Sequence, residues 1–216
     1  MSSSSSSYSF VGLRNLVMVA GHLVYTSGNY GNIDEKDSCG GDTRKDVGPR
    51  SEAQSYWAVV DSKHWFRKKE DMRWRALTEE HAKDSSENLL FSISRFKELA
   101  GIYPYNITVV SYDFKEERFA QLHRSAIGFP ETRFFYSGTP TSSTSKESTL
   151  KGEALVRTQF QEDPYGCLGS LRRKKLGCDP FHHSIPYPNG CPEIEELLHH
   201  CGVDPYSGHL PWSRRI

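Results

Sequence analysis

The stretch DSSENLLFSISRFKELAGIYPYNITVVSY, residues 84–112, predicts a helix followed directly by a strand. Asp84 and Glu87 have the spacing of a capping box at a helix start, and Gly101 stands where a left-handed residue ends a helix. Residues 107–112 are rich in β-branched side chains, which favour a buried strand. The apolar face of the predicted helix comprises Leu89, Ile93 and Phe96. Helices that alternate with buried strands are typical of a parallel α/β sheet.

The same alternation continues on both sides of this stretch. Residues 15–20 form an unbroken apolar run that ends at a glycine, as in a strand covered by helices on both faces. Helices are expected over 51–62 and 119–127, a strand over 133–136, and a further short strand over 74–77. The order strand, helix, strand, helix, strand predicts an α/β fold, a Rossmann-like three-layer sandwich with a mostly parallel sheet.

Three regions are expected along the chain. Residues 1–14 form a serine-rich leader that cannot bury enough surface to order itself, and residues 15–162 form the Rossmann-like domain, which ends with a helix over 150–160. Residues 163–216 contain many prolines and glycines, so we expect an irregular extension with one short helix over 192–201.

Composition limits the partners of this chain. Its 216 residues carry 27 Lys plus Arg and 27 Asp plus Glu, so no net field attracts nucleic acid or an anionic membrane. The longest apolar run near the N-terminus, residues 16–20, is far shorter than the roughly 20 residues of a membrane span. Partners must therefore be recognised by local sites. Five scattered cysteines favour reduced thiols in an intracellular compartment, so we expect a cytoplasmic protein. The sequence leaves the oligomeric state open.

Four blocks in a fixed order carry a family resemblance that extends from about Leu16 to Phe160. The blocks are Gly40-Gly41, Ser51-Glu52-Ala53, EEHAKDSSEN at 79–88 and VVSYDFKEER at 109–118. With them the chain resembles the YdcF-like family, the domain of unknown function 218, in its eukaryotic branch. This resemblance implies a Rossmann-like domain with a ligand cleft at the strand ends. It also implies an S-adenosylmethionine-like or other nucleotide ligand, and it names no reaction.

The chain departs from the family pattern in its residues and in its spacing. Ala20-Gly21-His22 replaces a glycine run, Cys39 replaces a serine, and Lys115 stands where the pattern has a histidine, three residues before Arg118. In the family a crossover helix and a strand separate strand one from the Gly-Gly turn, whereas only residues 22–39 are present here. Because a parallel crossover needs a dozen or more residues, we hypothesise a shortened isoform that lacks one βα unit and folds marginally.

The predicted ligand site combines a phosphate-type turn with side chains at the strand ends. Backbone N–H groups of the glycine pair and of the helix start would favour an anion, and cations that follow a strand would contact it. The ligand-binding candidates are Gly40, Gly41, Arg44, Ser51, Glu52, Asp84, Ser85, Glu87, Asn88, Lys115 and Arg118. Helix capping is an ordinary alternative for Asp84 and Glu87, and solvent exposure is the alternative for the arginines.

Other functions remain open at this stage. A hydrolase triad can be assembled from Ser51 or Ser111 with His123 and Asp113, although no nucleophile elbow is present. A group-transfer enzyme would use Glu87 with a histidine of the cleft, and an incomplete chain would have no activity. The C-terminal cysteines and histidines match no common zinc spacing, so no metal and no catalytic residue is assigned. These residues are Cys178, His182, His183, Cys191, His199, His200 and Cys201.

Overall fold

The computed structural model describes residues 10–21, 51–67, 71–141, 146–179 and 183–213. Its sheet contains three strands, β1 (Asn15–Val19), β2 (Asn106–Tyr112) and β3 (Phe134–Thr139), in the order β1-β2-β3. Both pairings are parallel, and Ile107 lies between Leu16 and Phe134 in the register. The predicted α/β fold with a parallel sheet is confirmed.

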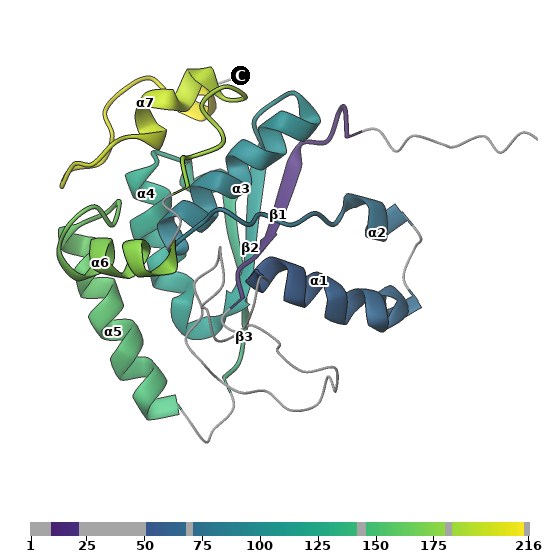
Figure 1. The fold of residues 1–216 in the computed structure, drawn as a ribbon, viewed down its shortest axis with the longest axis horizontal. Coiled ribbons are helices and arrows are strands. Elements are labelled where there is room, and N and C mark those ends of the chain that lie inside the picture. Colours follow the sequence, from purple (N-terminus) through teal and green to yellow (C-terminus); the bar gives the residue numbers. More distant parts are fainter. Residues whose placement is uncertain (1–9, 22–50, 68–70, 142–145, 180–182, 214–216) are drawn as a thin grey trace, which may run out of the picture.

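Helices connect and flank these strands (Figure 1). A π-helical segment, Arg118–His123, precedes α4, and a 3₁₀ turn, Asp113–Lys115, follows β2. The helices are α1 (Glu52–Ser62), α2 (Asp71–Arg75), α3 (Ser85–Ala100), α4 (Arg124–Ala126), α5 (Lys146–Glu162), α6 (Gly169–Cys178) and α7 (Glu195–Leu198).

Helix α3 begins and ends where the sequence predicts. The Asp84 carboxylate accepts a hydrogen bond from the backbone N–H of Glu87 at 2.8 Å, and Gly101 is left-handed with φ of 76°. Glu87 does not complete the capping box, because its carboxylate accepts from the backbone N–H of Lys83. The predicted helix is therefore confirmed, with a cap formed by Asp84 alone.

One face of the sheet forms the core. Met18 and Val109 are buried there against α3, whose inward side chains are also fully buried. On the opposite face Val17 is 62% exposed and Val19 is 64% exposed, and Phe135 of β3 is half exposed. The prediction that helices cover both faces of the first strand is wrong, because burial alternates along β1 as it does in a strand with one open face.

Two local predictions are also wrong. Residues 74–77 form no strand, since α2 ends at Arg75 and Trp74 remains about half exposed. The C-terminal region contains α6 in addition to the predicted short helix, which covers fewer residues than 192–201. A helix as polar as α6 shows little apolar periodicity, and only its Leu171 and Cys178 are buried.

The C-terminal region belongs to the same hydrophobic core as the sheet. Trp212 and Ile194 are buried in that cluster, and the Trp212 indole donates a hydrogen bond to the carbonyl oxygen of Ile127 at 2.9 Å. In Figure 1 the segment that carries α7 lies beside α3 and α4. Removing this region would therefore open the core rather than trim a separate tail.

The cysteines correct the prediction of reduced thiols. Cys167 and Cys201 form a disulfide across a separation of 34 residues, and Cys178 is disulfide-bonded as well. Cys191 is free and buried. The scattered spacing misled the sequence analysis because folding brings together cysteines that are far apart in the chain.

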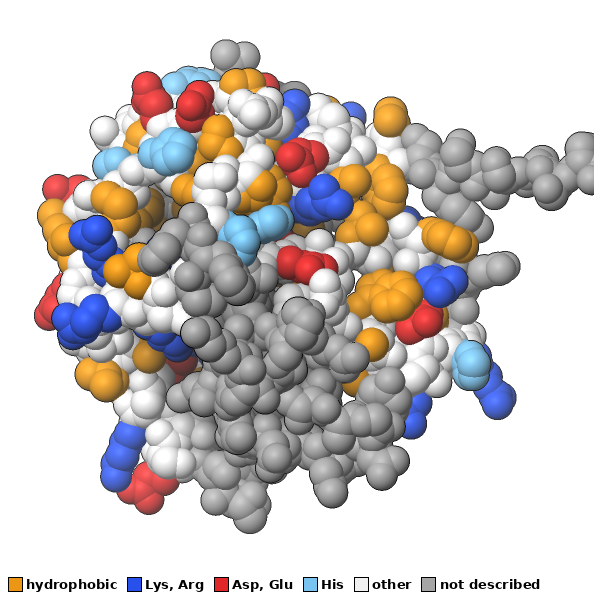
Figure 2. All heavy atoms as spheres, viewed as in Figure 1, with side chains coloured by type: hydrophobic (Ala, Val, Ile, Leu, Met, Phe, Trp, Pro, Cys, Tyr) orange, Lys and Arg blue, Asp and Glu red, His pale blue; other side chains and the backbone are white. Residues whose placement is uncertain are grey.

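No helix in the described ranges is long and apolar enough to cross a membrane. On the face shown in Figure 2, acidic and basic side chains are interspersed over the described surface. This mixture agrees with the equal numbers of positive and negative residues in the sequence.

Candidate functional site

The carboxyl ends of β1 and β2 lie side by side and carry the predicted site. Directly after β2, Lys115 extends its ammonium group to the carbonyl oxygen of Gly21, at 2.9 Å. The hydroxyl of Ser111 donates to the carbonyl oxygen of Ala20 at 2.7 Å. Two side chains from β2 and its turn therefore fix the end of β1.

Side chains of α1 approach the end of β1 closely at Gly21, which has no side chain of its own. Ser51 caps α1 by accepting from the backbone N–H of Gln54 at 3.0 Å, and the buried Glu52 follows it. A Cβ atom on Gly21 would lie 1.9 Å from Oε1 of Glu52, far inside van der Waals contact. The glycine after β1 thus permits the close approach of the start of α1.

Arg118 joins three elements at the centre of the site. Its Nη1 donates to Oγ of Ser85 at 3.0 Å, and its Nη2 pairs with Oε2 of Glu153 at 2.9 Å. Ser85 begins α3, Glu153 lies on α5, and both charged side chains are about nine-tenths buried. The π-helical geometry at Arg118 is a feature that recurs at functional sites.

His123 ends this π-helical segment and contacts the same serine. Its Nε2 lies 2.8 Å from Oγ of Ser85, and its ring packs edge-on against Phe119 and Phe160. Burial, with a smaller contribution from Arg118, holds the pKa of His123 well below its usual value. The imidazole is therefore neutral at physiological pH and orients the hydroxyl of Ser85.

Several buried polar atoms of this cluster have no hydrogen-bond partner among the described residues. They are Nε of Arg118, Nδ1 of His123 and Oε1 of Glu153. Buried polar atoms in native proteins are usually satisfied, so three such atoms in one cluster are a feature that a bound polar group would explain.

The two cations of the site affect each other. Burial, and then the positive charge of Arg118, lowers the pKa of Lys115 to about 8. Burial also lowers the pKa of Arg118, while Glu153 opposes that shift. Burial raises the pKa of Glu153, although the charge of Arg118 opposes the rise. Keeping these three buried side chains charged therefore costs desolvation free energy.

Asp84 and Glu87 form a second cluster around Lys175 of α6. The Lys175 ammonium group lies 3.1 Å from Oδ2 of Asp84 and 3.0 Å from Oε1 of Glu87. Burial raises the pKa of Glu87, and the two carboxylates raise the pKa of Lys175 against the effect of burial. This cluster joins α6 to the start of α3, a role in stability that accounts for both carboxylates.

The predicted site residues therefore fall into three groups. The structure brings Ser85 and Arg118 into contact and places Lys115 and Glu52 at the neighbouring strand end. It assigns Ser51, Asp84 and Glu87 structural contacts, and Asn88 continues α3 through its backbone bond to Asp84. Gly40, Gly41 and Arg44 lie outside the described residues, as does the proposed gap at residues 22–39.

Two members of the two clusters were not predicted from the sequence, and His123 was predicted with other partners. Glu153 and Lys175 come from α5 and α6, which follow all four of the family-like blocks. The contact of His123 with Ser85 joins residues that are 38 positions apart. The helical spacing of Glu153 gave no signal of its own, because a carboxylate on an amphipathic helix is normally solvated.

The triad proposed from sequence has a different set of partners. Ser111 bonds to a backbone carbonyl, Ser51 caps α1, and Asp113 accepts from the backbone N–H of Phe114. His123 instead contacts Ser85. Over the ranges that the structure describes, no group of three or more histidine, cysteine or acidic side chains is placed to hold a metal ion.

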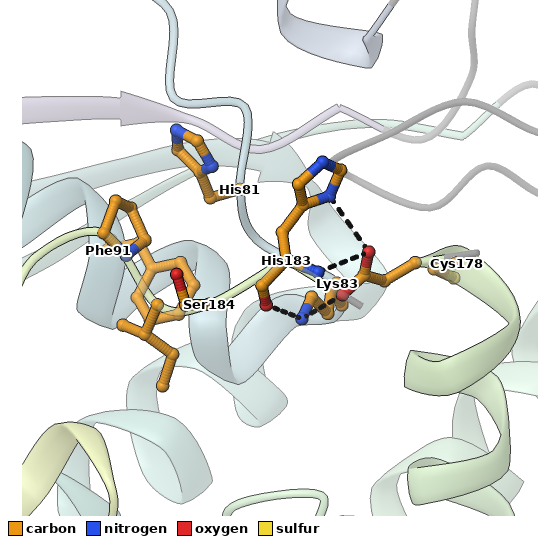
Figure 3. Close-up of a pocket in the computed structure, with 9 residues that line it drawn as sticks. His81, Lys83, Phe91, Cys178, His183 and Ser184 are labelled. Carbon is orange, nitrogen blue, oxygen red and sulfur yellow. Dashed lines mark hydrogen bonds and ion pairs between the residues drawn. The ribbon is translucent and has the colours of Figure 1, made fainter. Parts of the chain in front are cut away.

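Two cavities lie beside the segment that precedes α3, and neither shares a lining residue with the Lys115 and Arg118 cluster. The smaller, about 10 Å³, is close to the size of one water molecule and is drawn in Figure 3. There Lys83 pairs with Asp179 at 2.7 Å, and the His183 ring bonds to the same carboxylate. The larger, about 450 Å³, is lined by Thr78, Glu80, His81, Arg95, Glu98, His183, Pro186 and Tyr187.

The larger cavity has the volume of a small-molecule site. Few of the charged groups that line it, however, lack a hydrogen-bond or ion-pair partner. Glu80 accepts from the amide of Gln54 and from Thr78, and Glu98 pairs with Arg95. Because its main charged groups already have partners, this cavity is a weaker candidate than the strand-end cluster.

The chain has a detectable relative. It is 32% identical to uncharacterized protein YOR238W of Saccharomyces cerevisiae over 120 residues, which cover 51% of this chain and 40% of the yeast protein. The chain thus spans less than half the length of that relative. No family model matches the chain, and no solved structure matches it. The name of the yeast protein describes no activity, so function must be argued from the site.

Proposed function

We propose that this protein binds a small anionic or nucleotide-type ligand at the carboxyl edge of its sheet. The observation that carries the proposal is the pair of buried cations, Lys115 and Arg118, at the end of β2. Ligands of open α/β sheets bind at this edge. Among the described residues, Glu153 is the carboxylate in direct contact with this pair.

A bound anion would relieve the electrostatic cost of this arrangement. The pKa of Lys115 lies near 8 because burial and Arg118 both disfavour its charge. A negative group beside the two cations would favour the charged form and raise that pKa, with about 1.4 kcal/mol of interaction for each pKa unit. Binding is therefore expected to take up protons near pH 8 and to weaken as the pH rises above 8.

The nature of the ligand rests on the resemblance to the YdcF-like family, which we propose as the family of this chain. The resemblance favours S-adenosylmethionine or another nucleotide, and the cations favour a phosphate or carboxylate. Gly40 and Gly41 lie outside the described residues and are proposed as ligand-binding residues on the resemblance alone. We propose no nucleic-acid or membrane partner. The cytoplasmic location expected from reduced cysteines loses its support, because Cys167 and Cys201 form a disulfide.

Isothermal titration calorimetry of the full chain tests the proposal. Inorganic phosphate, ADP and S-adenosylmethionine are titrated at pH 7 and pH 9, in two buffers of different ionisation enthalpy. At least one is expected to bind at pH 7 with little proton uptake, and to bind less tightly and with larger proton uptake at pH 9. Lys115→Met should lose this pH dependence, whereas Lys151→Met, which changes an exposed lysine of α5, should not. Equal binding of all three compounds by wild type and Lys115→Met would contradict the proposal.

A hydrolase or group-transfer activity is the second candidate, and the contact of Ser85 with His123 favours it. A serine hydroxyl 2.8 Å from a neutral imidazole, with an arginine at 3.0 Å, has the parts of a nucleophile with a base and an anion-stabilising donor. The carboxylate route through Glu87 is less favoured, because Glu87 pairs with Lys175. Turnover of phosphoesters or peptides that is lost in Ser85→Ala would support the enzyme, and turnover that survives would exclude Ser85.

The hypothesis of a shortened, marginally stable chain has support from the open sheet face. Val17 and Val19 of β1 are more than 60% exposed, and β1 is an edge strand of the described sheet. A thermal unfolding scan tests this hypothesis directly. A broad transition below about 45 °C would support it, and a cooperative transition well above body temperature would contradict it.

A further inference from the structure

Lys115 is a buried amine with few polar contacts. Within the described part of the chain, the hydrogen bond that its Nζ atom makes is to the carbonyl oxygen of Gly21, although an ammonium group has three donors. The side chain is 6% exposed, and no carboxylate of the described residues lies within ion-pair distance of it. Glu52 and Glu153 favour the charge of Lys115 without an ion-pair contact, so that charge is compensated only in part.

The surroundings of this amine favour its neutral form. Arg118 lies one turn further along the chain and acts on Lys115 as a like charge. Nζ also lies 5.8 Å from the ring of Tyr112 and 6.0 Å from the ring of Phe114, and these cation–π contacts favour the charged form, so the neutral form is favoured by burial and Arg118 alone. Lysines placed beside a second cation and away from water are the lysines that act as nucleophiles in enzymes.

The fraction of reactive amine follows from the pKa. With a pKa of about 8, roughly a quarter of Lys115 is neutral at pH 7.5. An ordinary lysine with a pKa near 10.4 is about 0.1% neutral at that pH. At equal access, Lys115 thus presents on the order of 200 times more free amine than an exposed lysine.

We propose that Lys115 forms a Schiff base with a small aldehyde or ketone that carries a carboxylate or phosphate, and that Arg118 holds the anionic group. This inference rests on the proposed anion site and names its substrate class. Nε of Arg118 is buried and has no partner among the described residues, so it is available to an anionic oxygen. The amine and this donor lie three residues apart at the start of one helical segment.

The reaction balances without any further reagent. The neutral Nζ atom attacks the carbonyl carbon, and a proton moves from nitrogen to the carbonyl oxygen to give a carbinolamine. The carbinolamine then loses that oxygen with the second Nζ proton as one water molecule, which leaves a carbon–nitrogen double bond. Water hydrolyses the imine in the reverse direction, so the adduct is reversible until a hydride donor reduces it.

Reductive trapping of the full chain tests the inference. The protein is incubated with glyoxylate and sodium cyanoborohydride at pH 7.5, and carboxymethylated lysines are located by peptide mass spectrometry at several times. Lys115 is expected to be labelled at least 10-fold faster than the exposed Lys151 of α5, and phosphate is expected to slow labelling at Lys115 only. Formaldehyde, a carbonyl compound without an anion, should show a smaller preference for Lys115.

Two outcomes separate this inference from the anion site. Labelling of Lys115 no faster than Lys151 overturns the Schiff-base proposal, and phosphate binding that persists in calorimetry would leave the anion site intact. Fast labelling of Lys115 by glyoxylate and formaldehyde alike, without protection by phosphate, overturns the role of Arg118. All of these measurements use wild-type protein, so they do not depend on whether Lys115→Met folds.

Discussion

Replacing Arg118 with methionine should destabilise the protein by an amount that depends strongly on pH. The substitution removes the 2.9 Å ion pair with Glu153 and the hydrogen bond to Ser85, and it leaves a buried carboxylate without its cation. Breaking one side of a buried ion pair typically costs about 3–5 kcal/mol. Since native proteins are stable by only about 5–15 kcal/mol, the loss is large enough to measure without difficulty.

The pH dependence follows from the protonation of Glu153. Without Arg118, the isolated carboxyl group avoids its charge by taking a proton, which costs about 3.4 kcal/mol at pH 7 and about 0.8 kcal/mol at pH 5 for an ordinary pKa of 4.5. The folded pKa of Glu153, which burial already raises in wild type, then rises further, so the variant loses stability more steeply than wild type as the pH rises. The destabilisation relative to wild type should therefore shrink by up to about 2–3 kcal/mol between pH 7 and pH 5.

Urea unfolding followed by tryptophan fluorescence at both pH values measures these free energies, because Trp212 is buried in the core. The double variant Arg118→Met with Glu153→Gln is the matched control, since its amide cannot ionise. It should be more stable than Arg118→Met at pH 7 and should lack the extra pH dependence. A loss below 1 kcal/mol for Arg118→Met, or the same pH dependence in both variants, would refute the role assigned to this ion pair.

Three further substitutions test other parts of the structure. Gly21→Ala should cost about 1–3 kcal/mol in urea unfolding because its methyl group would lie 2.6 Å from Cε2 of the Tyr56 ring as well as against the flexible carboxylate of Glu52, and a neutral result would contradict this close approach. Asp84→Ala should cost about 1–2 kcal/mol or more through loss of the α3 cap, with an equal loss at pH 7 and pH 9, and a stability unchanged within 0.3 kcal/mol would exclude it. Cys201→Ser should lower stability by up to about 4 kcal/mol by opening the 34-residue loop that Cys167 closes, and reductant should then have less effect on the variant than on wild type.

The elements that could be predicted from sequence are those specified by neighbouring residues. Helix α3 has its cap, its apolar face and its terminating Gly101 within one stretch, so its bounds needed no information from the rest of the fold. The succession of helices and strands along the chain could be predicted for a similar reason, apart from the strand expected at 74–77, because short β-branched runs alternated with helical spacing. Helix α6 lacks these local signals, and its contacts with the start of α3 become visible only in three dimensions.

The residues of the candidate site also differ in whether neighbouring sequence predicts them. Lys115 and Arg118 could be predicted because they follow a recognisable strand, where cations are placed near ligands. Their partners could not, since Glu153 and His123 reach the site from elements whose relative placement the sequence does not specify. An exposed face of a sheet is equally hard to predict. The apolar run of β1 would have the same sequence pattern whether helices cover one face of the strand or both.

Two neighbouring residues at the start of α3 have different roles. Asp84 has a structural role, and Ser85 is linked to the proposed ligand site. Asp84 caps α3 through Oδ1 and pairs with Lys175 through Oδ2, although Oδ2 has no hydrogen-bond partner among the described residues. Ser85 is not needed for the cap, and its hydroxyl group contacts Arg118 and His123 instead. Stability should consequently follow the residue at position 84, whereas the orientation of Arg118 should follow position 85. A ligand at the strand ends would therefore depend on Ser85 through the position of the guanidinium group, and on Asp84 only through the folding of α3.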